Sequence, residues 1–217
     1  MKLKFIFVII LSIASILFFD LIESTLLNIG LSWTFSKIIP YLFLLICGFF
    51  LFFQIRKGIT GKILKNVLSF LILFLPFVIG FILHPIFEGD FSKDGSTSVK
   101  NSSSSDFKKD GLMVISIADC PFCFGAIEKL KLIKKRNPSL NIEFVVCTKN
   151  KEYIKNYMEE IDNSFPIRLA DNADSLVASA NFRFPAFVVV RNKKPVYVWS
   201  NDEFGVRAID QLESDVK

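Results

Sequence analysis

Three long apolar stretches in the first 84 residues constrain the fold of this chain most strongly. They cover about residues 5–22, 34–54 and 66–84. Each is near the length that an α-helix needs to cross ~30 Å of hydrocarbon. Because lipid offers the backbone no hydrogen-bond partners, a segment that spans it has to be helical. We therefore predict an all-α membrane region, residues 1–87, with about three transmembrane helices.

The first apolar stretch has a second interpretation. A basic start, with Lys2 and Lys4, followed by an apolar core also fits a signal peptide. No small-x-small cleavage site follows it and further apolar stretches do, so we favour an uncleaved helix. The sequence leaves open whether this segment crosses the membrane or bends and re-enters it.

The excess positive charge of the chain is confined to this membrane region. Residues 1–84 hold seven Lys or Arg and two Asp or Glu, which accounts for the whole net charge of +5. A nucleic-acid-binding protein would carry a basic patch on its soluble part. We therefore expect the lipid bilayer, and no nucleic acid, as a partner of this charge.

The distribution of these charges predicts the topology. Four basic residues lie between the second and third apolar stretches, whereas the loop between the first two holds only Lys37 beside Asp20 and Glu23. Basic loops stay in the cytoplasm. We predict a multi-pass protein of the cell membrane with a cytoplasmic N-terminus. Everything after His84 is then extracytoplasmic (periplasmic in a Gram-negative cell), where a disulfide can persist.

The rest of the chain reads as a linker and one domain. Residues 88–110 are polar and rich in serine, a composition typical of a flexible linker. Residues 111–217 alternate between strand and helix patterns, which predicts a mixed sheet covered by helices. The expected strands are 112–117, 142–147, 165–169, 187–191 and 196–200, the last two forming a hairpin, and the expected later helices are 152–161, 173–180 and 202–212.

Cys120 and Cys123 stand where the first expected strand gives way to a helix. Pro121 suits the first helical position, so Cys120 lies at or just before the helix N-terminus and Cys123 one turn in. The unpaired N–H groups and the dipole of a helix N-terminus stabilise a thiolate. The thiolate is the attacking species in disulfide exchange. Cys123 can resolve the mixed disulfide that Cys120 forms.

A zinc site or a purely structural disulfide would also use such a pair. A zinc ion needs about four ligands, whereas the domain offers only Cys147 besides the pair, and the one histidine, His84, lies far upstream. We therefore expect no metal, and a redox-active Cys120–Cys123 disulfide in place of a cofactor.

Two motifs resemble the thioredoxin-like superfamily, specifically its membrane-tethered thiol–disulfide oxidoreductases of the TlpA/ResA type. One is Cys120-Pro121-Phe122-Cys123 after a strand, and the other is residues 182–190, similar to the family segment in which a cis-proline precedes a strand facing the CxxC. The resemblance covers about residues 112–214 and implies an α/β thioredoxin-like domain attached to the membrane region. It also implies a cis Pro185 and substrate-binding roles for Phe184, Pro185, Pro121 and Phe122.

The sequence departs from this family in three places. Asp119 stands where the family commonly has an aromatic residue, and its carboxylate would push the pKa of Cys120 upward. Residues 112–117 lack the buried acid that often accepts the proton of the second cysteine, so the acceptor for Cys123 stays unassigned. Cys147 is an extra thiol, either a small buried hydrophobe or a third redox cysteine.

We therefore predict an extracytoplasmic thiol–disulfide oxidoreductase that exchanges its CxxC dithiol with a protein substrate. A low pKa of Cys120 would stabilise the reduced form of the pair and make the protein an oxidant. Because Asp119 works against a low pKa, it favours a reductant over an oxidant. A separate membrane electron donor or acceptor is needed, because the apolar stretches contain only Cys47. The alternative is a non-enzymatic binding module of a membrane transport or assembly complex with a structural disulfide, which burial of both sulfurs would favour.

Overall fold

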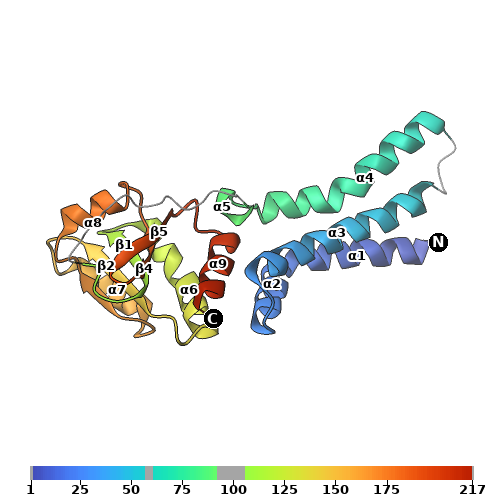
Figure 1. The fold of residues 1–217 in the computed structure, drawn as a ribbon. Helices are drawn as coiled ribbons and strands as arrows, with labels where there is room; N and C mark the ends of the chain where they lie inside the picture. Colours follow the sequence, from blue (N-terminus) through green and yellow to red (C-terminus); the bar gives the residue numbers. More distant parts are fainter. Residues whose placement is uncertain (1, 57–60, 92–105, 217) are drawn as a thin grey trace. The chain divides into compact units, whose positions relative to one another are not determined.

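A computed structural model describes residues 2–56, 61–91 and 106–216 of the chain (Figure 1). The chain divides into two compact units, Met1–Ile86 and Phe87–Lys217.

Four helices make up the described part of the first unit: α1 (Lys2–Leu17), α2 (Phe19–Asn28), α3 (Trp33–Arg56) and α4 (Lys62–Leu83). By length and composition α3 and α4 can each cross a membrane. Helices α1 and α2 supply a third span only if they count as one segment, because a bend of 68° separates them. The predicted stretch 5–22 runs across that bend. Two to three long apolar helices thus indicate that the chain is anchored in a membrane.

His84, at the end of α4, contacts the other three helices of this unit. Its Nδ1 lies 3.1 Å from a carboxylate oxygen of Asp20, and its Nε2 lies 3.1 Å from the carbonyl oxygen of Ile16. The imidazole stacks on Phe19, and the His84 carbonyl accepts a hydrogen bond from the Tyr41 hydroxyl. The one histidine of the sequence therefore contacts residues of α1, α2 and α3 from the end of α4.

The second unit is built on a five-stranded mixed sheet, as the alternating pattern predicts. Its strands are β1 (Gly111–Ile117), β2 (Ile142–Cys147), β3 (Ile167–Leu169), β4 (Ala186–Arg191) and β5 (Lys194–Ser200), in the order β3-β2-β1-β4-β5. Strands β1, β2 and β3 are parallel, and β4 and β5 are antiparallel to their neighbours. The central strand β1 is buried on both faces along residues 112–116, which explains its continuous apolar run.

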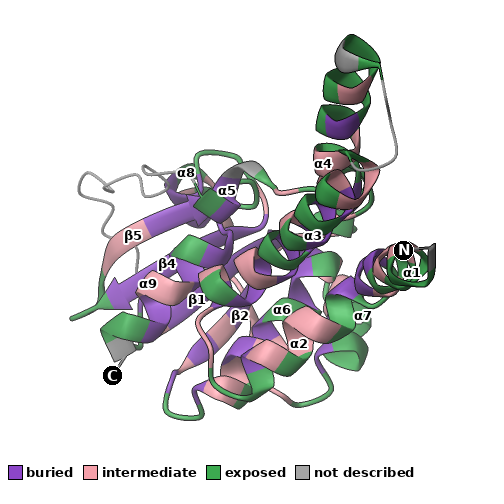
Figure 2. Ribbon diagram, turned by 90° about the vertical axis from the view of Figure 1, so that its right-hand side faces the viewer, coloured by how far each residue is buried: buried purple, intermediate pink, exposed green. Residues whose placement is uncertain are grey.

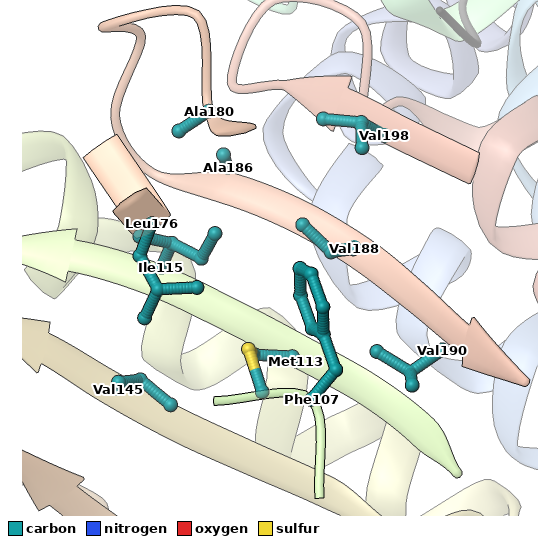
Figure 3. Packing of buried hydrophobic residues seen from close by; sticks show 10 residues of the cluster. All are labelled: Phe107, Met113, Ile115, Val145, Leu176, Ala180, Ala186, Val188, Val190 and Val198. Atoms are coloured by element: carbon teal, nitrogen blue, oxygen red, sulfur yellow. The ribbon is translucent and has the colours of Figure 1, made fainter. Parts of the chain in front are cut away.

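Helices α6 (Pro121–Arg136), α7 (Tyr153–Ile161) and α9 (Val206–Val216) cover one face of the sheet. On this face Tyr157 of α7 packs on Phe144 of β2, and the Arg136 guanidinium of α6 makes two hydrogen bonds to the Glu213 carboxylate of α9. Helix α8 (Ala173–Ser179) covers the opposite face, where Leu176 joins a cluster of side chains from β1, β2, β4 and β5 (Figure 3). Strands β1 and β4, at the centre of the sheet, are buried along most of their length (Figure 2).

The predicted linker contains ordered parts of this unit. Residues 92–105 lie outside the described residues, but Glu88–Phe91 form a short helix, α5, that packs against α9. At the other end of the stretch, Phe107 is buried in the cluster beneath α8. The fully buried Asp106 carboxylate accepts hydrogen bonds from Arg168 and from the backbone N–H groups of Asp171 and Asn172.

The last helix starts later than its pattern predicts. Helix α9 begins at Val206, whereas the sequence predicts a start at residue 202. Residues 201–205 form a turn in which the Phe204 ring stacks on Phe187, with the ring centroids 3.8 Å apart. Burial of this ring against the sheet outweighs the local helical pattern.

Candidate active site at the start of helix α6

A two-residue turn, Ala118 and Asp119, carries the chain from β1 to Cys120. Asp119 is exposed and has a φ of 51°, a left-handed conformation that aspartate tolerates better than most residues. Cys120 is the N-cap of α6 and Pro121 its first residue, as predicted. Cys120 and Cys123 are joined by a disulfide.

The first turn of α6 directs its free N–H groups at Cys120. The backbone N–H of Cys123 lies 3.2 Å from the Cys120 sulfur, and the Cys120 carbonyl accepts from the N–H groups of Cys123 and Phe124. The cysteine sulfur therefore takes the place of the oxygen that usually caps a helix. A thiolate at this position would receive a charge-assisted hydrogen bond and face the positive end of the helix dipole.

The two cysteines differ in access to solvent. Cys120 is 6 % exposed and Cys123 is completely buried. In the disulfide form Cys120 is therefore the more exposed member of the pair, although both residues are buried.

Tyr157 lies under the turn that carries Cys120, a contact that the sequence analysis missed. Its hydroxyl donates to the carbonyl of Ile117 at 2.8 Å and lies 3.1 Å from the hydroxyl of Ser116. The same hydroxyl accepts from the backbone N–H of Cys120. Burial, together with the Asp119 carboxylate, raises the pKa of Tyr157 above its ordinary value despite these hydrogen bonds. Tyr157 is thus a neutral phenol that braces the end of β1.

Two segments that the sequence singles out meet at one end of the sheet. The Phe184–Pro185 peptide bond is cis. Ala186 pairs with Ile115 of the antiparallel β1, so Pro185 precedes β4 at the end of the sheet where β1 leads to Cys120. Phe184 is only partly buried and packs on the cluster beneath α8.

Cys147 ends β2, in register with Ile117 at the end of β1. It is a free thiol, half-buried against the cluster beneath α8. Burial, reinforced by the Asp106 carboxylate and opposed by Arg168, raises the pKa of Cys147 to about 12. At neutral pH this cysteine is a protonated thiol, whose reactivity is low.

A cavity of about 530 Å³ opens beside the disulfide, and we call it the α5–α6 cavity. Its walls are the first turns of α6, including Pro121 and Phe122, the segment Phe87 to Asp90, and the turn between β5 and α9. The wall that α5 supplies was not predicted, because the composition of residues 88–91 is typical of a linker.

No cluster of three or more His, Cys, Asp or Glu side chains that could hold a metal ion occurs within residues 2–56, 61–91 and 106–216.

The sheet order, the CxxC pair at the helix start and the cis-proline before β4 define a thioredoxin-like domain. No protein-family model and no curated protein matches the chain.

Among solved structures, the chain is similar to a secreted disulfide oxidoreductase of Mycobacterium tuberculosis homologous to E. coli DsbE. The identity is 19 %, the match covers 50 % of this chain and 80 % of that one, and the TM-score is 0.38. It is also similar to the thioredoxin domain of a thiol–disulfide oxidoreductase from Bacteroides vulgatus, with 21 % identity, coverage of 52 % of this chain and 83 % of that one, and a TM-score of 0.42. For MTB DsbF the identity is 16 %, the match covers 50 % of this chain and 81 % of that one, and the TM-score is 0.42.

Proposed function

We propose that this protein is a membrane-tethered thiol–disulfide oxidoreductase of the TlpA/ResA type. The observation that carries the proposal is the Cys120 sulfur at the N-cap of α6, which accepts a hydrogen bond from the Cys123 N–H in a residue that is more exposed than Cys123. A helix N-terminus of this kind activates a cysteine for exchange with another disulfide.

The reaction proceeds in two exchanges. In the reduced protein the Cys120 thiolate attacks one sulfur of a substrate disulfide, which breaks, and the other substrate sulfur leaves as a thiolate and takes up a proton. Deprotonated Cys123 then attacks Cys120 in the mixed disulfide and releases the second substrate thiol. The protein loses two electrons and ends as the Cys120–Cys123 disulfide, and the substrate gains them.

We place the domain outside the cytoplasm, where the substrate is a protein with a disulfide or thiols. Pro185, Phe184, Pro121 and Phe122 form the surface that meets this substrate. A separate membrane protein supplies or removes the electrons, because the described apolar helices hold Cys47 as their one cysteine. Asp119 next to Cys120 opposes a low thiolate pKa, which favours a reductant.

A second candidate function is a binding module with a structural disulfide. It is favoured by the burial of both cysteines, since Cys120 is only 6 % exposed and Cys123 is not exposed at all. In this case the domain would bind its partner without exchanging electrons.

The deciding experiment is the reduction potential of the Cys120–Cys123 pair. We would equilibrate the full chain in detergent, carrying Cys47→Ser and Cys147→Ser, with dithiothreitol or glutathione buffers. A value near or below about −270 mV supports a reductant, and a value near about −120 mV reverses the direction of electron flow. A folded protein whose disulfide does not equilibrate at all would establish the binding module. Independently, Cys123→Ala should trap mixed disulfides, and the matched variant Cys120→Ser/Cys123→Ala should trap none.

A further inference from the structure

Four phenylalanines line the α5–α6 cavity, together with glycines and polar residues that include Lys129 and Asp202. Phe187 of β4 and Phe204 before α9 stack on each other and are both buried. Phe122 and Phe87, which also line the cavity, are 67 % and 66 % exposed. Exposed aromatic rings gathered beside a reactive residue are typical of a binding surface.

Specific contacts hold α5 in place as a wall of this cavity. The carboxylate of Asp90 is almost completely buried and accepts hydrogen bonds from the backbone N–H of Phe87 at 2.9 Å and of Val206 at 3.4 Å. The second bond satisfies a free N–H group at the start of α9. Gly89 and Gly205 bring the two backbones together so closely that a Cβ atom on Gly205 would lie 2.2 Å from the Gly89 carbonyl carbon.

The opposite wall contains a glycine that packing does not require. Gly125 lies within α6, where glycine is less favourable than alanine because it loses more backbone freedom on folding. A Cβ atom at Gly125 would meet no heavy atom within 4 Å. Since the described surroundings leave room for a side chain, the effect of the glycine is to keep the cavity open.

We propose that the α5–α6 cavity binds a large apolar side chain, such as that of phenylalanine, from the substrate polypeptide joined to Cys120. Pro121, which directly follows Cys120, lines the cavity, so a chain bonded to the Cys120 sulfur starts at its edge. The volume of about 530 Å³ is in the range of pockets that enclose apolar groups. This inference rests on the proposed function and adds the selectivity of the same site: α5, which is not part of the thioredoxin-like sheet and its covering helices, selects substrates with an apolar residue next to their cysteine.

The test uses two short peptides that differ only beside their single cysteine, which carries a thionitrobenzoate leaving group. One has phenylalanine on both sides of the cysteine and the other has serine. The reduced full chain in detergent, with Cys47→Ser, Cys147→Ser and Cys123→Ala, attacks each peptide through Cys120, and the released thionitrobenzoate is followed by absorbance. We expect the phenylalanine peptide to react at least about tenfold faster.

Two cavity variants and one control test whether the cavity causes this preference. Gly125→Leu places a side chain in the cavity and also suits a helix better than glycine, so we expect it to fold and to reduce the rate ratio to within about twofold. Glu128→Leu adds the same side chain to the exposed surface of α6 and should keep the ratio. Gly205→Ala, whose Cβ displaces α5, should lower the ratio like Gly125→Leu.

The possible failures are distinguishable. Equal rates for the two peptides on the parent protein, or an unchanged ratio in Gly125→Leu, would overturn the cavity inference and leave the oxidoreductase standing. An unchanged ratio in Gly205→Ala would overturn the role of α5. A parent protein that releases thionitrobenzoate from neither peptide would refute the proposed function itself.

Discussion

Cys147 offers a quantitative test of how the structure controls thiol reactivity. With a pKa of about 12, only about one Cys147 in 10,000 is a thiolate at pH 8. An ordinary cysteine, with a pKa of about 8.5, is about one-quarter thiolate at that pH. A thiolate of higher pKa is also intrinsically more nucleophilic, which returns a factor of roughly 25–55. We therefore expect Cys147 to react roughly 50–100-fold more slowly than a small free thiol, before any steric hindrance.

The assay uses the oxidised full chain carrying Cys47→Ser, in which Cys147 is the remaining free thiol. Its reaction with 4,4′-dithiodipyridine is followed by absorbance from pH 6 to 10, with glutathione as reference. The rate should rise tenfold per pH unit across this range without a plateau. Unfolding the same variant in guanidinium chloride should restore the rate of an ordinary thiol.

A variant separates the two causes of the high pKa. Asp106→Asn removes the like charge but leaves the burial, which is the larger cause, so we expect the rate to recover only in part. A plateau near pH 8.5 in the folded parent protein would refute the reasoning and make Cys147 a candidate third redox cysteine. A rate within threefold of that of glutathione at pH 8 would refute it equally.

Three further predictions concern stability, measured as guanidinium unfolding followed by Trp199 fluorescence in a Trp33→Phe background. Tyr157→Phe keeps the ring but removes the shorter of the two hydrogen bonds to the Ile117 carbonyl, which is then left with the Ser116 hydroxyl at 3.2 Å. We expect a loss of about 0.5–1.5 kcal/mol; a loss below about 0.5 kcal/mol would contradict the bracing role. Burial alone would raise the pKa of Asp106, but Arg168 and the N–H groups of Asp171 and Asn172 lower it below its ordinary value. The stabilisation of the folded state by the Asp106 carboxylate is thus complete above the unfolded pKa of about 3.9 and is lost as the pH falls toward the lower folded pKa. We therefore expect the parent protein to lose more stability below pH 5 than Asp106→Asn. Parallel plots of unfolding free energy against pH for the two proteins would argue against this. Glu213→Ala removes the acceptor of Arg136 and Asn137 and should cost about 3–5 kcal/mol, whereas Glu159→Ala on an exposed position should change stability by less than about 0.5 kcal/mol.

Local chemistry was enough to predict the start of α6 and most of the sheet. Pro121 and the helical spacing after it indicate where the helix begins, and the structure confirms Cys120 as its N-cap. Strand β2 has the bounds that its apolar run predicts, because every residue of the strand except Glu143 is apolar and most of them are buried. The mixed order of the strands follows from the helical crossovers and the final hairpin.

The features that the sequence did not reveal depend on contacts between distant residues. Nothing near Tyr157 in the sequence indicates that its hydroxyl reaches Ile117, 40 residues earlier. The four residues of α5 form too short a helix for a periodic pattern. They are held by Asp90, whose carboxylate accepts a hydrogen bond from the N–H of Val206 at the start of α9, 116 residues later. The roles of Asp119, Phe184 and Pro185 in exchange stay predictions, since they concern a substrate.

The docking of α5 decides where a soluble version of this protein should begin. A fragment starting at Asp106 would keep the sheet and the CxxC pair but lose Asp90, so the N–H of Val206 would lose its partner. The cavity that the stacked rings of Phe187 and Phe204 line would also lose the wall that α5 provides. Such a fragment would expose an aromatic patch beside its reactive cysteine, and this patch would favour self-association and non-specific binding to other proteins. Phe87 is therefore the first residue that a faithful water-soluble version has to include.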